Sequence, residues 1–235
     1  MHSKTSLADL GERMQRQWQM LVAQLLGRGR HWLALPEALQ LLWAVGPWRE
    51  ELRQLLLHLA DRCDHRLHPL PWALPVPLRV HGHYSRAEIL AAFEVLDGRG
   101  APRSHREGVL WDEASQTDIL FITLRRSEAL FSPTTRYRDL ALGPGLFHWE
   151  SQSTTTAASP TGKRYIQHEA QGSRVLLFVR EHRRQDGRPG GHTEPFRCLG
   201  FARYAGHEGE RPMAIRWRLE RQIPAAWLHG MALAV

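Results

Sequence analysis

Hydrogen-bonding side chains are concentrated between residues 148 and 168. Residues 152–155 (QSTT) form a run of neutral donors and acceptors, and residues 159–164 (SPTGKR) follow closely. Hydroxyl groups, backbone amides and a lysine–arginine pair at a turn are the groups that bind phosphate oxygens. This segment therefore predicts contact with a nucleic-acid backbone.

Rings on either side of the run could contact a base that is turned out of its stack. His148 and Trp149 precede the run, and Tyr165 and His168 follow it. Aromatic rings stack on such bases, and imidazoles hydrogen-bond to their edges. A second polar loop lies at 131–137 (FSPTTRY). The candidate nucleic-acid-binding residues are His148, Trp149, Gln152, Ser153, Thr154, Thr155, Thr161, Lys163, Arg164, Tyr165, His168, Arg136 and Tyr137. A structural role is the alternative, because tryptophan more often fills a core and serine–threonine runs often cap turns.

Catalytic patterns are weak in this chain. Ser153 with His148 or His168 could supply a nucleophile and a base, but no Gly-x-Ser-x-Gly elbow is present. Residues 63–68 (CDHRLH) are zinc-compatible in type, but no second cysteine pair accompanies them. No Gly-x-x-x-x-Gly-Lys-Ser/Thr phosphate loop occurs. We expect a module without catalytic residues, metal or cofactor.

Composition favours a polyanionic partner. The 235 residues carry a formal net charge of +7, and Lys4 and Lys163 are the only lysines. Arginine binds phosphates through a planar fork, and basic surfaces release the counterions of nucleic acid. A GC-rich genome could equally explain the arginine bias, although not the net excess. The sequence has no apolar run of about eighteen residues, no apolar secretion signal and only two cysteines. These features favour a cytoplasmic protein.

Hydrophobic spacing predicts helices in the N-terminal third. Apolar residues recur every three or four positions over 7–26, and Pro36 and Pro47 begin two further helical patterns. Four prolines between residues 69 and 77 exclude a helix and predict a stiff, extended linker. We therefore expect a helical bundle at 1–68 and a linker at 69–80.

The pattern changes after residue 80. Ser85 and Glu88 have the spacing of a capping box, and six strand-like runs follow the helix that they predict. In the last run Arg216 and Arg218 alternate with apolar residues, which indicates one buried and one basic face. The runs are 108–111, 118–124, 146–149, 174–180, 196–202 and 213–219. The fold class is therefore α+β, with 81–235 forming a mostly antiparallel β-sheet or partly closed β-barrel with one or two helices.

Several motifs of this second region are those of a known family. The longest is 146–155 (LFHWESQSTT), continued by 159–168 (SPTGKRYIQH). Shorter motifs are 84–90 (YSRAEIL), 131–137 (FSPTTRY), 175–181 (VLLFVRE), 207–209 (HEG) and 217–219 (WRL). On these motifs the region from about 81 to 228 resembles domain of unknown function 3427 (DUF3427). In related proteins this domain usually follows a superfamily-2 helicase, often preceded by a phospholipase-D-like nuclease, in architectures typical of bacterial restriction or antiviral defence.

The resemblance implies a DNA-binding or sensing module that helps a helicase or nuclease select DNA, with a modified or single-stranded form as an expected target. Lys163, Arg164 and Arg136 would contact the backbone, and His148, Gln152 and Tyr165 would contact the base. A second hypothesis is a protein-interaction scaffold that docks a helicase or nuclease subunit. That scaffold would expose an apolar patch at Trp18, Trp32, Trp43 and Trp48. A third is a stand-alone hydrolase or nuclease whose pocket brings His148, Ser153 and His168 together.

Overall fold

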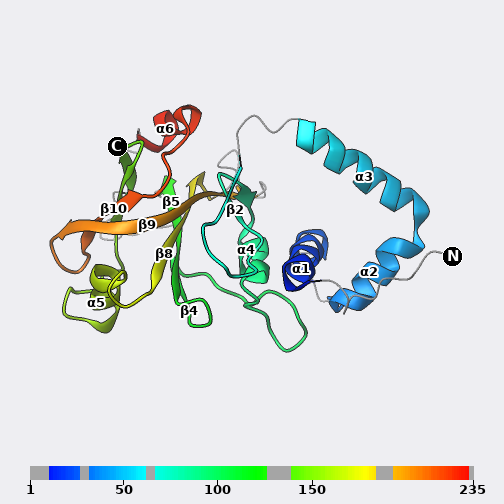
Figure 1. The fold of residues 1–235 in the computed structure, drawn as a ribbon, viewed down its shortest axis with the longest axis horizontal. Coiled ribbons are helices and arrows are strands. Elements are labelled where there is room, and N and C mark those ends of the chain that lie inside the picture. The colour runs from blue at the N-terminus through cyan, green and yellow to red at the C-terminus, as the bar shows by residue number, and fades with distance from the viewer. Residues whose placement is uncertain (1–10, 27–31, 62–66, 126–138, 184–192, 233–235) are drawn as a thin grey trace. The chain divides into compact units, whose positions relative to one another are not determined.

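The computed structural model describes residues 11–26, 32–61, 67–125, 139–183 and 193–232. The chain forms two compact units (Figure 1). The helical unit comprises residues 1–78 and 84–105, and the sheet unit comprises residues 79–83 and 106–235. The units differ from the predicted division at residues 84–105, which group with the N-terminal helices instead of the strands.

A pair of packed helices organises the helical unit. Its elements are α1 (Glu12–Leu26), α2 (Leu35–Ala44), α3 (Gly46–Asp61), β1 (His68–Pro69) and α4 (Arg86–Ala92). The predicted capping box begins α4, because Ser85 Oγ accepts the Glu88 amide and the Glu88 carboxylate accepts the Ser85 amide. Arg16 of α1 donates to the Ala92 carbonyl at 3.1 Å and pairs with Glu94 at 2.8 Å. These bonds attach α1 to the end of α4.

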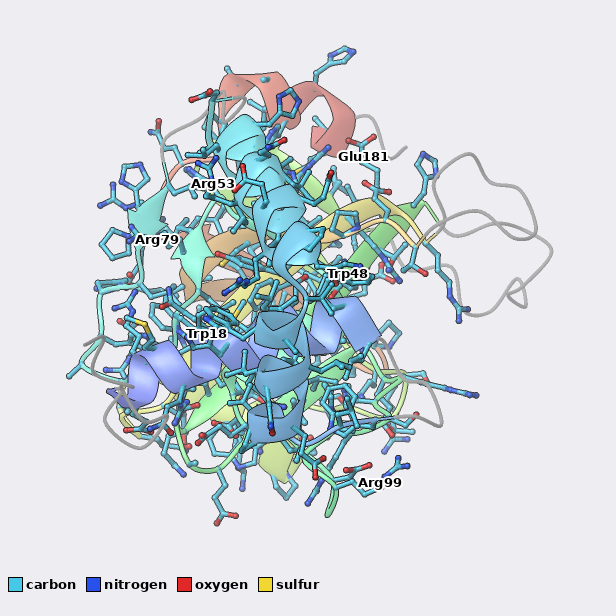
Figure 2. The ribbon with its side chains drawn as sticks, turned by 90° about the vertical axis from the view of Figure 1, so that its right-hand side faces the viewer. Trp18, Trp48, Arg53, Arg79, Arg99 and Glu181 are labelled. Atoms are coloured by element: carbon cyan, nitrogen blue, oxygen red, sulfur yellow. The ribbon has the colours of Figure 1, made fainter. Side chains whose placement is uncertain are left out.

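The helices α2 and α3 leave their apolar side chains in solvent. Each has the predicted proline in its first turn, and neither contains a buried residue. Trp43 meets Trp18 edge-on, with ring centroids 5.4 Å apart, yet Trp43 stays 51% exposed. Trp48, labelled with Arg53 in Figure 2, is 64% exposed. The large exposed apolar residues from α2 to α3, the α2–α3 apolar surface, are Leu41, Trp43, Val45, Trp48, Leu55, Leu56, Leu57 and Leu59.

The proline-rich stretch at 69–80 bends at residues 71–74 and is packed into the fold. Val76, Leu78 and Val80 are buried, as is Leu70. Pro77, between Val76 and Leu78, is buried as well. The expected linker is therefore a part of the packed fold, and it leads into β2 (Arg79–Val80) and β3 (His83–Tyr84).

An open mixed sheet forms the sheet unit. Its elements are β4 (Val109–Asp112), β5 (Thr117–Arg125), β6 (Leu140–Gly143), β7 (Leu146–Glu150), α5 (Pro160–Gln167), β8 (Arg174–His182), β9 (Phe196–Glu208), β10 (Ala214–Leu219) and α6 (Ala225–Ala232). The strand order is β4-β5-β8-β9-β10-β7-β6. The two end strands do not pair, so the expected partial closure into a barrel is wrong, whereas the α+β class is confirmed.

One pair in the sheet is parallel. β5 and β8 run in the same direction from Thr117↔Arg174 to Arg125↔His182, with β6, β7 and α5 in the connection between them. Residues 175–180 of β8 are all buried, which is typical of a central strand covered on both faces. The remaining strand pairs along the order are antiparallel, as predicted.

The core of the sheet unit lies beneath α5. Trp149 of β7, Tyr165 of α5 and Trp217 of β10 meet there with the apolar side chains of β5 and β8. Ile215, Trp217 and Leu219 are buried, whereas Arg216 is half-buried and Arg218 is exposed. The predicted alternation of a buried and a basic face in β10 is thus confirmed.

Candidate nucleic-acid interface

Ser151 and the backbone of the loop that follows β7 are hydrogen-bonded within the fold. Ser151 and Met213 exchange two bonds: the Ser151 amide donates to the Met213 carbonyl, and the Met213 amide donates to Ser151 Oγ, each at 2.9 Å. The Arg211 amide donates to the Thr155 carbonyl at 3.2 Å, and the Ala157 amide donates to the Glu210 carboxylate at 2.9 Å. The loops 151–157 and 210–213 therefore brace each other.

The motif at 159–162 begins a helix, where the residue types predict a turn. Ser159 Oγ accepts the Gly162 amide at 3.1 Å and donates to the Thr156 carbonyl at 2.6 Å. Pro160 occupies the first turn of α5, where a missing amide costs nothing. A Cβ at Gly162 would lie 1.9 Å from the Thr156 carbonyl oxygen, so only glycine allows this close approach. The serine–threonine run thus shapes a turn.

Two of the predicted base-contacting rings lie in the core. Trp149 is 5% exposed and Tyr165 is fully buried, and their ring centroids are 5.6 Å apart in an edge-on contact. Burial raises the pKa of the Tyr165 phenol well above its ordinary value. Both rings stabilise the sheet in this structure, and neither offers a face to a base.

Arg164 is held by an ion pair within the fold. Its guanidinium donates to both carboxylate oxygens of Asp118, at 2.7 and 2.8 Å, and lies 4.3 Å from the centroid of the Trp111 ring. Asp118 is fully buried; burial raises the pKa of its carboxyl group, and the Arg164 hydrogen bonds oppose that rise. Arg164 therefore fastens α5 to β5, and its fork is occupied.

His168 is similarly engaged. Its Nε2 accepts the Tyr204 amide at 3.1 Å, which leaves the proton on Nδ1, 3.4 Å from the Ser173 carbonyl oxygen. Burial lowers the pKa of the imidazole, so the neutral form is favoured. A histidine with both nitrogens bonded in this way is not placed to act as a base for Ser153.

Four predicted residues remain exposed: Gln152, Ser153 and Thr154 at the tip of the loop, and Lys163 on α5. Thr155 is buried and Thr161 is half-buried. His148 is half-buried on β7, on the face opposite Trp149. Arg136 and Tyr137 lie outside the described residues.

A cluster of arginines occupies the outward face of β9 and β10. Arg218 lies directly opposite Arg203 in the register, and Arg216 lies opposite His148 of β7. Residues opposite each other in an antiparallel pair project from the same face, so these side chains form one surface, termed the arginine face. Its members are His148, Arg203, Arg216 and Arg218.

The charge of the arginine face is only partly neutralised. Arg216 pairs with Glu208 at 2.7 Å, and Arg203 lies 3.5 Å from Glu169 and 3.6 Å from Glu220. Arg218 is exposed and makes no ion pair within the described part of the chain. Like charges directly opposite each other destabilise a sheet, and an incoming anion would relieve that repulsion. The arrangement can bind a phosphate backbone.

Sequence reasoning found two of these arginines and missed the third. Arg216 and Arg218 stand out because β10 alternates strictly. Arg203 belongs to β9, whose pairing with β10 shifts at a bulge between Ile215 and Trp217, so a simple period-two pattern does not place it.

The described residues give no support for a metal site or for a membrane-spanning helix. Across them, no three histidine, cysteine, aspartate or glutamate side chains gather as metal ligands would. No described helix has the length and apolar character to cross a membrane.

The comparisons agree with the resemblance noted in the sequence. A family model described as Domain of unknown function (DUF3427) matches residues 78–230. A search of the curated proteins found no match. The matched region contains the braced loops, the central parallel strands and the arginine face. Because the match covers well over half of the chain, the chain belongs to the DUF3427 family.

Proposed function

We propose that this chain is a non-catalytic DNA-binding module that contacts the phosphate backbone through the arginine face. The observation that carries the proposal is the cross-strand pair of Arg203 and Arg218, with Arg218 lacking any carboxylate partner in the described residues. A like-charge pair reduces the stability of the isolated sheet, so its presence favours a polyanionic ligand.

The exposed tip of the 151–157 loop extends this surface. β7 ends at Glu150, which pairs with Ala214, two residues before Arg216 in β10. Gln152, Ser153 and Thr154 follow at that end and carry neutral donors and acceptors. We propose that these groups favour single-stranded or modified DNA, in the bacterial restriction or antiviral defence setting that the family resemblance implies.

DNA binding over a salt series tests the proposal. Single- and double-stranded oligonucleotides, unmodified and modified, would be titrated into the wild-type chain and into Arg203→Ala and Arg218→Ala variants. Each lost phosphate contact should reduce the slope of log affinity against log salt concentration by about 0.7–0.9. Arg106→Ala is the matched control, because Arg106 is an exposed arginine of the sheet unit that lies just before the edge strand β4. Slopes that are equal in all four proteins would refute the arginine face as the DNA-binding surface.

The α2–α3 apolar surface favours a second function, the docking of a helicase or nuclease subunit. Helices that expose this many leucine and tryptophan side chains are typical of one half of a protein interface. A superfamily-2 helicase from the same genome is the partner to test, by co-purification and by sedimentation of the mixture. Trp48→Glu and Leu56→Glu should abolish the complex and leave DNA binding unchanged. If the complex forms equally well with these variants, the surface does not dock the helicase.

A further inference from the structure

The central strand β8 begins with an exposed arginine. Arg174 is the first residue of β8 and lies in solvent, whereas residues 175–180, which follow it, are all buried. Its guanidinium carbon lies 5.9 Å from the centroid of the Phe201 ring on β9. Phe201 and Arg203 are two residues apart on β9, and alternate residues of a strand project from the same face. Arg174 therefore lies on the same face of the sheet as Arg203.

The register of the sheet places three arginines side by side. Val175 of β8 pairs with Ala202 of β9. Arg174 comes just before the first of these residues and Arg203 just after the second, so the antiparallel register sets the two arginines opposite each other. Arg203 in turn lies opposite Arg218 of β10. Neighbouring strands are about 4.8 Å apart, so the backbone positions of the three arginines, termed the arginine row, span roughly 10 Å.

Carboxylates offset only part of the charge of the arginine row. All three arginines are exposed to solvent. Glu169 and Glu220 lie 3.5 and 3.6 Å from Arg203, which is longer than an ordinary hydrogen bond between nitrogen and oxygen. Like charges opposite each other destabilise a sheet, and here the repulsion acts across two successive strand pairs. A ligand with several negative charges in line would relieve the repulsion along the whole row.

We propose that the phosphate backbone of one DNA strand crosses β8, β9 and β10 along the arginine row, so that successive phosphates meet Arg174, Arg203 and Arg218. Phosphates of one strand advance by about 3.4 Å along a duplex axis, so a row of roughly 10 Å faces about three of them. The inference rests on the proposed function and extends it, because it adds Arg174 to the site and gives the direction of the bound backbone. A path lengthwise along β10 would use Arg216 and Arg218 instead, but Arg216 already pairs with Glu208 at 2.7 Å.

The test measures binding of a single-stranded oligothymidylate to the whole chain over a salt series. Arg174→Ala should reduce the slope of log affinity against log salt concentration by about 0.7, and Arg216→Ala should reduce it less. Arg174→Lys should keep the wild-type slope, because the slope counts charges and not the shape of the guanidinium. Glu220→Gln should raise the affinity, because it removes a carboxylate that competes for Arg203. Arg106→Ala should behave as the wild type does, and thermal midpoints would show that each variant is folded.

The outcomes separate the arginine row from the arginine face. A reduced slope in Arg174→Ala that the lysine variant restores would support the row. An unchanged slope in Arg174→Ala, beside a reduced slope in Arg218→Ala, would overturn the row and leave the arginine face as the DNA-binding surface. A larger reduction by Arg216→Ala than by Arg174→Ala would also overturn it, in favour of a path along β10. If neither Arg203→Ala nor Arg218→Ala changes the slope, the proposed function itself fails, and the row with it.

Discussion

The hydrogen-bonded part of the 151–168 segment differs from Arg218 of the arginine face in how the fold uses its polar side chains. The segment is rich in hydroxyl groups, yet Ser151 and Ser159 bond to neighbouring backbone, and Arg164 is paired with Asp118. The arginine face has fewer polar groups, but Arg218 has no partner in the described residues. A surface can bind a ligand only through donors and acceptors that have no partner within the fold. The number of polar residues in a segment therefore predicts a binding site less well than the number of donors and acceptors left without a partner.

The largest effect that this comparison predicts is at Gly162. Gly162→Ala places a Cβ against the Thr156 carbonyl oxygen, and should lower the free energy of unfolding by about 3 kcal/mol or more, since backbone must move. Urea denaturation of the purified variant measures the loss. Gly145→Ala is the control, because no atom lies within 4 Å of its added Cβ. Equal stability of the two variants would show that the loop does not pack on α5 as described.

A smaller loss is expected on breaking the ion pair beneath α5. Asp118→Asn removes the charge that neutralises Arg164 and should lower the free energy of unfolding by about 2–3 kcal/mol. The loss should be smaller than for a fully buried ion pair, because Arg164 is partly exposed. A double-mutant cycle with Arg164→Met measures the coupling. A coupling energy near zero would mean that Asp118 does not hold Arg164, which would then be available for the predicted contact with the DNA backbone.

Acidification should destabilise the sheet unit through His168. Burial holds the folded pKa of His168 below its ordinary value of 6.5, so the unfolded chain binds more protons as the pH falls from that value towards the folded pKa. The contribution of His168 to the free energy of unfolding is therefore fully present above about pH 6.5 and decreases below that pH. Urea midpoints between pH 7.5 and 5.5 should fall less in His168→Gln than in the wild type. Parallel curves for the two proteins would argue against the buried neutral imidazole.

The smallest effect is expected on the arginine face, and it has the opposite sign. Arg218→Ala removes a like charge opposite Arg203, and should raise the free energy of unfolding by about 0.2–1 kcal/mol while it weakens DNA binding. Denaturation and DNA titration of the same preparation measure both. A variant that loses stability would mean that Arg218 has a structural role, and the contrast between the two regions would disappear.

Much of the fold could be predicted from local patterns. All six strand-like runs are strands, and the Ser85 capping box begins α4 as expected. β6 was missed because its four residues are bounded by Gly143 and lack a clear alternation. The parallel pairing of β5 with β8 was also missed, although the unbroken apolar run 175–179 is typical of a strand buried on both faces.

The candidate site was harder to predict, because function depends on partners that are distant in sequence. Arg164 looks like a phosphate contact until Asp118, 46 residues away, is brought beside it. His168 looks like a base until Tyr204, 36 residues away, donates to it. The start of α5 could have been recognised, since Ser159 followed by Pro160 is a common cap and first turn.

The parallel pair at the centre of the sheet also constrains how the chain folds. The hairpins β4–β5, β6–β7 and β9–β10 join strands that are close in sequence and can form early. The bond between Arg180 and Thr123 spans 57 residues, so the strands it joins meet only after a long loop has closed. Contacts of such separation slow folding, so the joining of β5 to β8 is expected to limit the rate at which the sheet assembles.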